Sequence, residues 1–148
     1  MNSYHKLWIC SEAVDTEYWK ACNYYRTKEL AIEAARNAWG KAKDDNTDDF
    51  EDTFGYLPDS LSDTRALKSF AVGQCVSAAL PNFSDTVIEH AWESVYDEVG
   101  EFATDYLDDV TKEEKIELES LIRDWFIRNN NLPSCYTIRN VEEVRFLD

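Results

Sequence analysis

Residues 84–110 read SDTVIEHAWESVYDEVGEFATDYLDDV, and this stretch predicts one long amphipathic helix. Its apolar residues recur at alternating steps of four and three, a spacing typical of a helix face that packs against a core or a partner helix. Ser84 is placed to cap the helix, and Phe83 is placed to form a hydrophobic staple with Ile88. We therefore expect a single helix with one buried seam. The predicted seam consists of Ile88, Trp92, Val95, Val99, Phe102 and Tyr106.

The other face of this predicted helix is acidic. Seven acids follow one another at four-residue steps, and two more lie beside them: Asp85, Glu89, Glu93, Asp97, Glu101, Asp105 and Asp109, with Glu98 and Asp108. Like charges at this spacing destabilise a helix by about 0.2–0.5 kcal/mol per pair. No lysine or arginine lies between Lys68 and Lys112. Two interpretations stay open, namely a solubilising face and an anionic surface selected for binding.

The negative charge of the chain is concentrated in one internal block. The chain has 148 residues and a net charge of −15, and residues 44–110 hold 17 of its 30 acidic residues but only 2 of its 15 basic ones. The remaining residues are neutral overall. Such a balance disfavours direct binding to nucleic acid or to an anionic membrane, and it favours a partner with a basic surface.

A second acidic stretch, DDNTDDFED, occupies residues 44–52. Its acids are Asp44, Asp45, Asp48, Asp49, Glu51 and Asp52. An EF-hand reading fails, because Asp49 stands where the calcium loop needs glycine and Gly55 stands where it needs a bidentate glutamate. We expect a mobile acidic loop without a metal. Phe50, Phe54, Tyr56 and Leu57 indicate that it folds back onto the body of the protein.

The remaining segments predict a single α+β domain over residues 1–148. Residues 4–10 and 17–26 predict two strands of an N-terminal hairpin, and residues 135–147 predict a last strand, bulged near Asn140, beside that hairpin. Three further helices are expected: one capped by Thr27, one that begins at Ser62 or Asp63 and continues to Ala78, and one that begins at the capping box of Thr111 and Glu114. The expected fold is thus a small antiparallel sheet with about four helices, one of them long and acidic.

The sequence shows no recognisable catalytic motif. It has no G-x-S-x-G, H-E-x-x-H, P-loop or G-x-G-x-x-G pattern, and its four cysteines have no C-x-x-C spacing. We therefore expect no enzyme, no cofactor and no metal site. An apolar signal segment and a run of transmembrane length are also absent from the sequence, so we expect a cytoplasmic protein with reduced thiols.

A helical row of carboxylates can imitate the phosphates of DNA. Neighbouring acids of such a row lie ~6 Å apart along the axis, and a helix over residues 84–110 would be ~40 Å long, against ~34–36 Å for one turn of DNA. A protein that holds phosphates with lysine and arginine would also release its counterions on binding this surface. Binding should then compete with nucleic acid and weaken steeply with salt.

In size and charge layout, the chain resembles the small acidic phage or plasmid proteins that block restriction enzymes or CRISPR complexes by DNA mimicry. The residues that carry the resemblance are 44–52 and the row from Asp85 to Asp109, under half of the chain. It implies an anti-restriction or anti-CRISPR inhibitor that docks through these acids without catalysis. Because such families have unrelated folds, the resemblance implies nothing about the fold.

An alternative function is an acidic interaction or assembly module for another basic partner. The terminal parts of the chain are neutral and rich in aromatic residues, so docking through Tyr18, Trp19, Tyr24 or Tyr25 would leave the acids only to steer the encounter. The apolar seam fits packing within the chain or between two copies, which leaves a homodimer open.

Overall fold

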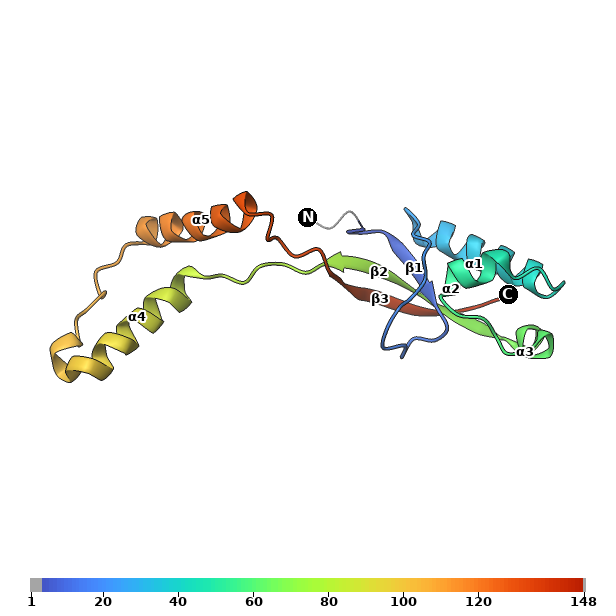
Figure 1. Cartoon of the computed structure of the whole chain (residues 1–148), viewed down its shortest axis with the longest axis horizontal. Helices are drawn as coiled ribbons and strands as arrows, with labels where there is room; N and C mark the ends of the chain where they lie inside the picture. The colour runs from blue at the N-terminus through green and yellow to red at the C-terminus, as the bar shows by residue number, and fades with distance from the viewer. Residues whose placement is uncertain (1–3, 148) are drawn as a thin grey trace. The chain divides into compact units, whose positions relative to one another are not determined.

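The computed structural model describes residues 4–147, which form an α+β fold with a three-stranded antiparallel sheet and five α-helices (Figure 1). This confirms the predicted fold class. In chain order the elements are β1 (Trp8–Ser11), α1 (Lys28–Ala42), α2 (Asp48–Phe54), α3 (Leu61–Ala66), β2 (Ser69–Ser77), α4 (Ser84–Val99), the 3-10 helix η1 (Gly100–Ala103), α5 (Lys112–Arg128) and β3 (Tyr136–Arg145).

The chain divides into two compact units. Met1–Ala78 and Ser134–Asp148 form the first, here called the sheet unit, and Ala79–Pro133 form the second, here called the helical unit. Each is described by itself below, and the single domain over residues 1–148 stays a prediction. No helix within residues 4–147 combines the length and the apolar character needed to span a bilayer.

The central strand of the sheet is β2, which pairs with β1 on one side and with β3 on the other. We predicted a helix over this segment, and that prediction is wrong. A central strand covered on both faces is apolar almost without interruption, so it lacks the period-two alternation that identifies a strand. The central position also explains Gly73, because a Cβ atom there would lie 2.4 Å from Cγ2 of Ile138 on β3.

The predicted N-terminal hairpin does not form. Residue 9 of β1 pairs with Gly73 of β2, and residues 17–26 contribute a single bridge, between Tyr25 and Trp8. The aromatic residues that suggested a second strand serve packing instead. The ring of Tyr24 stacks on that of Tyr4 at 4.0 Å, and its hydroxyl lies 2.7 Å from the hydroxyl of Tyr136.

The C-terminal strand and its bulge are confirmed. β3 pairs with β2 in antiparallel register, and the register shifts between Val72 and Gln74, which face Glu142 and Arg139. A step of two residues along β2, from Val72 to Gln74, therefore corresponds to a step of three residues along β3. Asn140 lies in this interval of β3 and has a positive φ of 54°. The bulge thus lies at the predicted residue.

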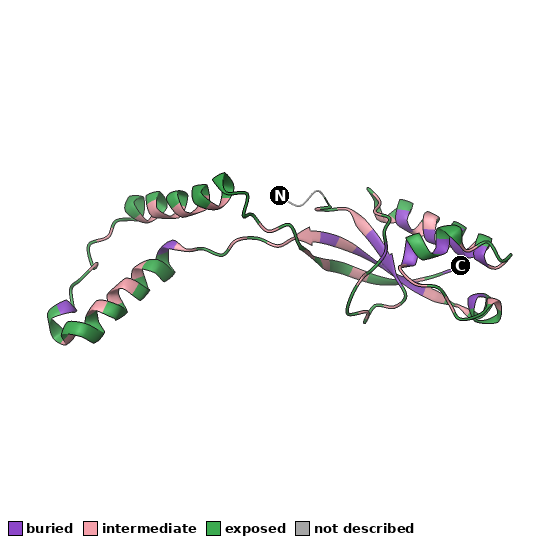
Figure 2. Cartoon of the chain, in the orientation of Figure 1, coloured by how far each residue is buried: buried purple, intermediate pink, exposed green. Residues whose placement is uncertain are grey.

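The main core lies between the sheet and helices α1 and α2, where most buried residues are found (Figure 2). The helix α1 begins as predicted, with the Thr27 hydroxyl accepting from the Leu30 N–H at 3.1 Å. Its alanines at 31, 35, 38 and 42 are buried, which lets the helix approach the sheet closely. The buried members of this cluster are Cys10, Ala31, Ala35, Ala38, Trp39, Ala42, Phe50, Phe54, Phe70, Val72 and Phe146. A smaller cluster contains Ile9, Ala21 and Cys75. Ile9 and Cys75 point to the opposite face of the sheet from Cys10 and Val72, because side chains alternate along a strand.

The acidic stretch 44–52 is partly helical and is not a loop throughout, which corrects the prediction. Asp48–Phe54 form α2, because Phe50 and Phe54 stand four residues apart and both enter the core. The predicted fold-back is confirmed for Phe50, Phe54 and Tyr56, whereas Leu57 is 43% exposed. The burial of one apolar face is therefore enough to order a segment whose composition suggested mobility.

The helical unit contains α4 and α5, and α4 is shorter than predicted. It ends at Val99, because Gly100 adopts a φ of 62° and a ψ of −134°, and the chain continues through η1 and a run of turns. Phe83 is the N-cap and makes no side-chain cap, so the predicted Ser84 cap is wrong. The ring of Phe83 stacks on Phe126 of α5 at 5.4 Å. The capping box of Thr111 and Glu114 that starts α5 is confirmed.

The predicted buried seam is only half-buried in α4 and is exposed beyond it. Ile88, Trp92 and Val95 are partly covered, whereas Val99 is exposed and Phe102 is 97% exposed. The prediction that Phe102 supports the core is therefore wrong. The physical reason is the end of the helix at Gly100, after which the three-four periodicity of the sequence no longer describes the positions of the side chains.

Candidate functional site

The structure places the predicted binding acids in two different units. All fifteen are exposed. Six belong to the sheet unit: Asp44, Asp45, Asp48, Asp49, Glu51 and Asp52. Nine belong to the helical unit: Asp85, Glu89, Glu93, Asp97, Glu98, Glu101, Asp105, Asp108 and Asp109. Each set is therefore described within its own unit.

Three of the six predicted acids of the sheet unit have a structural explanation. Asp48, Asp49 and Glu51 lie in the first turn of α2, where the helix dipole favours negative charge. The Asp49 carboxylate also accepts from the Lys41 ammonium at 2.6 Å. These three acids are therefore explained by stabilisation of a short helix, and no binding partner is needed to account for them.

The acids of the helical unit have few partners. This unit carries 14 acidic and four basic residues. Of its nine predicted acids, only Asp85 forms an ion pair within the described residues, with the Lys115 ammonium at 3.1 Å. The surface is thus anionic with little internal compensation.

The acidic row is regular only along α4. From Asp85 to Asp97 each four-residue step advances by ~40° around the axis, so these acids wind across one side and the back of the helix. The 16 residues of α4 are ~24 Å long at ~1.5 Å each, shorter than the ~40 Å expected. Glu101, Asp105 and Asp109 lie on η1 and the following turns, so they leave the row.

A hollow of about 460 Å³ lies beside α4 within the helical unit. One wall is the side of α4 that carries Asp85, Ile88, Glu89 and Trp92, and the other wall is the turn segment 104–108. Lys115 of α5 completes the lining. The lining of the hollow therefore combines apolar and aromatic residues with acidic ones. Its lining residues are Asp85, Ile88, Glu89, Trp92, Thr104, Tyr106, Leu107, Asp108 and Lys115.

Specific contacts hold this hollow together. The Trp92 indole N–H donates to the Ala103 carbonyl at 3.1 Å, which ties the turn segment to α4. The Trp92 ring also stacks on Tyr96 at 5.0 Å. Leu107 has a φ of 67°, an unusual conformation for a branched side chain that turns the chain toward α5. Sequence reasoning missed Thr104, Leu107 and Lys115, although Gly100 was a possible signal that the helix ends before this turn.

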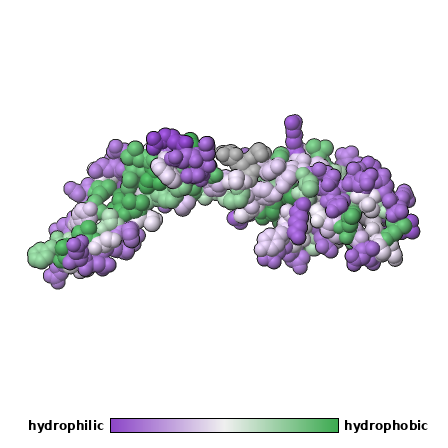
Figure 3. Space-filling model, viewed as in Figure 1, coloured by the Kyte–Doolittle hydropathy of each residue, from purple (hydrophilic) through white to green (hydrophobic). Residues whose placement is uncertain are grey.

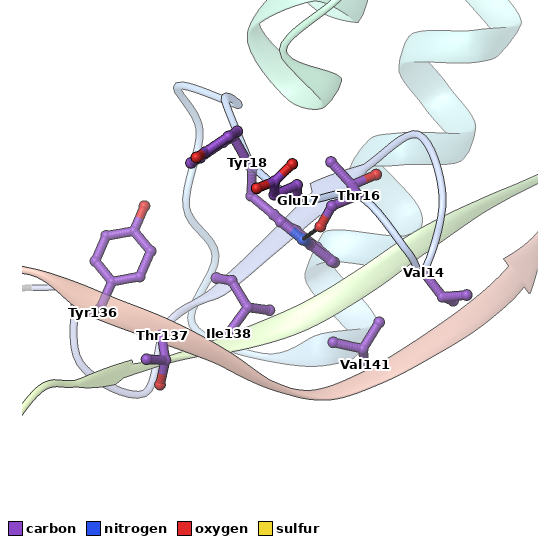
Figure 4. A pocket seen from close by; sticks show the side chains of 9 residues that line it. Val14, Thr16, Glu17, Tyr18, Tyr136, Thr137, Ile138 and Val141 are labelled. Carbon is purple, nitrogen blue, oxygen red and sulfur yellow. Dashed lines mark hydrogen bonds between the residues drawn. The ribbon is translucent and has the colours of Figure 1, made fainter.

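A second hollow, of about 550 Å³, lies in the sheet unit (Figure 4). The loop residues that line it are Val14, Thr16, Glu17, Tyr18 and Trp19. The Trp19 indole N–H donates to the Thr16 carbonyl at 3.1 Å. The residues contributed by β3 are Tyr136, Thr137, Ile138 and Val141. Its only carboxylate is that of Glu17, so its chemistry is that of an aromatic groove.

The aromatic residues considered as an alternative docking surface are mostly used inside the sheet unit. Tyr18 is 70% exposed, whereas Trp19, Tyr24 and Tyr25 are half-buried. Trp19 and Tyr24 pack against the smaller core cluster, and Tyr25 packs against the main one. Only Tyr18 therefore remains as an exposed contact from this set.

The cysteines and histidines of the described residues do not gather into a reactive site. Burial raises the pKa of Cys10 to about 12 and that of Cys75 to about 11, which keeps both thiols protonated at neutral pH. Cys22 and Cys135 are exposed. The His5 Nδ1 accepts from the Ser77 N–H at 3.0 Å. Within residues 4–147, no group of three or more His, Cys, Asp and Glu side chains is arranged to hold a metal ion.

Comparison of the chain with protein-family models, with curated proteins and with solved structures finds no match.

Proposed function

We propose that the protein is a non-catalytic acidic binding protein that inhibits a nucleic-acid-binding protein, such as a restriction or CRISPR complex, by presenting carboxylates where that protein expects phosphates. One observation carries the proposal. The helical unit exposes nine acids over residues 85–109, and only Asp85 among them has an ion-pair partner in the described structure. A surface of this kind attracts a basic partner and repels nucleic acid.

The size of the surface fits part of a DNA site. The ~24 Å of α4 corresponds to about two thirds of a DNA turn of ~34–36 Å. A basic groove that exchanges condensed counterions for this helix would bind it with a steep salt dependence. The mechanism is occlusion of the groove, without chemistry, and the proposal places the protein in the cytoplasm with its target.

The test is affinity capture from a bacterial lysate, with and without excess duplex DNA. A row variant carries Glu89→Gln, Glu93→Gln, Asp97→Asn and Glu101→Gln. Its control carries the same charge change on exposed acids of the sheet unit: Glu12→Gln, Asp15→Asn, Glu33→Gln and Asp59→Asn. We expect the native protein and the control to retain a DNA-binding protein that duplex DNA displaces, and the row variant to lose it. A partner that is retained equally by the row variant and in excess DNA would refute the proposal.

A second candidate function is an interaction module that docks through apolar residues. The observation that favours it is α5, in which none of the 17 residues is fully buried. Leu121 is 60% exposed and Trp125 is 50% exposed, although both are large apolar residues. Hydrophobic residues are visible along the helical unit, bordered by hydrophilic ones (Figure 3). Binding that survives high salt but is lost in the variant Leu121→Ser, Trp125→Ser would support this function over DNA mimicry.

A further inference from the structure

The hollow beside α4 has the chemistry of a receptor for a cationic side chain. Its lining includes the apolar or aromatic side chains of Trp92, Tyr106 and Leu107 together with the acidic residues Asp85, Glu89 and Asp108. A planar cation gains from an aromatic face and from a carboxylate at the same time. Neither feature alone selects this ligand, because apolar floors take neutral groups and exposed acids bind cations weakly.

The chain itself already places one cation among these lining residues. The Lys115 ammonium lies 3.1 Å from the Asp85 carboxylate, and both residues line the hollow. This pair compensates one of the three acids. Glu89 and Asp108 have no ion-pair partner within the described residues, so the hollow keeps a net negative charge. Its uncompensated carboxylates and its aromatic lining residues are complementary to a guanidinium group.

We propose that this hollow binds an arginine side chain of the basic partner, with the guanidinium paired to Glu89 and Asp108 and lying against Trp92 or Tyr106. The inference rests on the proposed function in assuming a basic partner, and it adds a specific contact to a surface otherwise described by charge. Arginine is favoured over lysine because its planar group both stacks on a ring and forms two parallel hydrogen bonds with a carboxylate. The site would act as an anchor, while the remaining acids of α4 steer the encounter.

The test uses the full chain and two blocked peptides, hexa-arginine and hexa-lysine. Calorimetry gives the affinities, and the indole N–H signal of Trp92 in ¹H–¹⁵N spectra reports on the hollow. We expect hexa-arginine to bind more tightly than hexa-lysine and to shift the Trp92 indole signal. Similar affinities for the two peptides, with an unmoved Trp92 signal, would overturn the inference.

Matched variants separate the hollow from general charge. The double variant Glu89→Gln, Asp108→Asn neutralises two acids that line the hollow. The double variant Glu93→Gln, Asp97→Asn neutralises two exposed acids elsewhere on α4. We expect the first pair to weaken hexa-arginine binding about tenfold and the second about twofold at most. Equal weakening by both pairs would overturn the hollow as a specific site, and it would leave the proposed DNA mimicry standing.

A gain of affinity provides an independent check that does not depend on damaging the surface. Lys115→Met removes the internal ammonium and leaves Asp85 available to the ligand. Lys112→Met makes the same charge change one turn earlier in α5, outside the lining. We expect Lys115→Met to increase the affinity for hexa-arginine more than Lys112→Met does. An equal change in both variants would contradict the inference, whereas lysate capture that ignores DNA would contradict the proposed function alone.

Discussion

Glu119 shows how one side chain can set the arrangement of two helices. Its carboxylate accepts from the backbone N–H of Phe83 at 2.9 Å and from that of Ser84 at 2.8 Å, and it pairs with Arg123 at 3.3 Å. A residue of α5 thus caps the N-terminus of α4, where the first N–H groups have no partner inside the helix. No local pattern in the sequence indicates this cap, because its acceptor lies 35 positions away from Ser84.

Replacing Glu119 by alanine should destabilise the protein by about 1–2 kcal/mol, since two N–H groups lose a charged acceptor. Urea unfolding measures the loss, and faster amide exchange at Phe83 and Ser84 would locate it. Glu117→Ala is the matched control, because Glu117 is exposed on the same helix. Equal effects of the two substitutions would contradict the assigned cap.

The buried thiols predict a loss of stability in alkali. Burial raises the pKa of Cys10 to about 12 and that of Cys75 to about 11, from an ordinary value of 9.0. The unfolded chain therefore releases these protons first, so their contribution is fully present below pH 9 and is lost as the pH rises toward 11 and 12. Burial also raises the pKa of Tyr56 to about 12, which acts in the same direction.

We expect the free energy of unfolding, measured in urea at a series of pH values, to fall from about pH 9 upward, by as much as ~1.4 kcal/mol per pH unit for each buried group. Cys10→Ala should make this slope shallower. The exposed Cys22 supplies the control, since Cys22→Ala should leave the slope unchanged. A stability that is constant or rises above pH 9 would show that the thiols are not buried as described.

At the scale of elements, two glycines predict opposite effects of the same substitution. Gly40 lies inside α1 with no atom within 4 Å of an added Cβ, whereas Gly100 ends α4 with a positive φ of 62°. Gly40→Ala should stabilise the protein by about 0.5–1 kcal/mol, because alanine loses less conformational entropy in a helix. Gly100→Ala should cost about 1–2 kcal/mol from backbone strain. Thermal unfolding of both variants checks the signs, and stabilisation by Gly100→Ala would show that α4 prefers to continue.

The elements that the sequence predicted well are those with local signals. Thr27 begins α1, and the Thr111–Glu114 capping box begins α5, because a cap and the helix it serves are neighbours in sequence. The strand β2 was missed because its pattern follows from burial on both faces, which depends on β1, β3 and the helices. The end of α4 was missed because Gly100 was read as an interior position of a longer apolar periodicity.

At the scale of the whole molecule, the charge of the helical unit opposes folding. Four acids lie at four-residue steps along α4, namely Asp85, Glu89, Glu93 and Asp97. Neutralising the last three together with Glu101 should raise the free energy of unfolding by about 1 kcal/mol at low salt, since like-charge pairs cost ~0.2–0.5 kcal/mol each. The gain should shrink at high salt as the repulsion is screened. Urea unfolding at two salt concentrations measures both effects, and a loss of stability would mean that the acids have partners in the fold.

The sequence by itself determined the composition of the candidate site. It predicted that the excess negative charge lies in residues 44–110 and that the acids along α4 face solvent, because solvation of carboxylates depends little on the rest of the fold. Tertiary structure alone decided which acids act together. The hollow beside α4 exists because the chain reverses after Gly100 and the Trp92 indole N–H holds the Ala103 carbonyl, and contacts of this kind join residues that no periodicity connects.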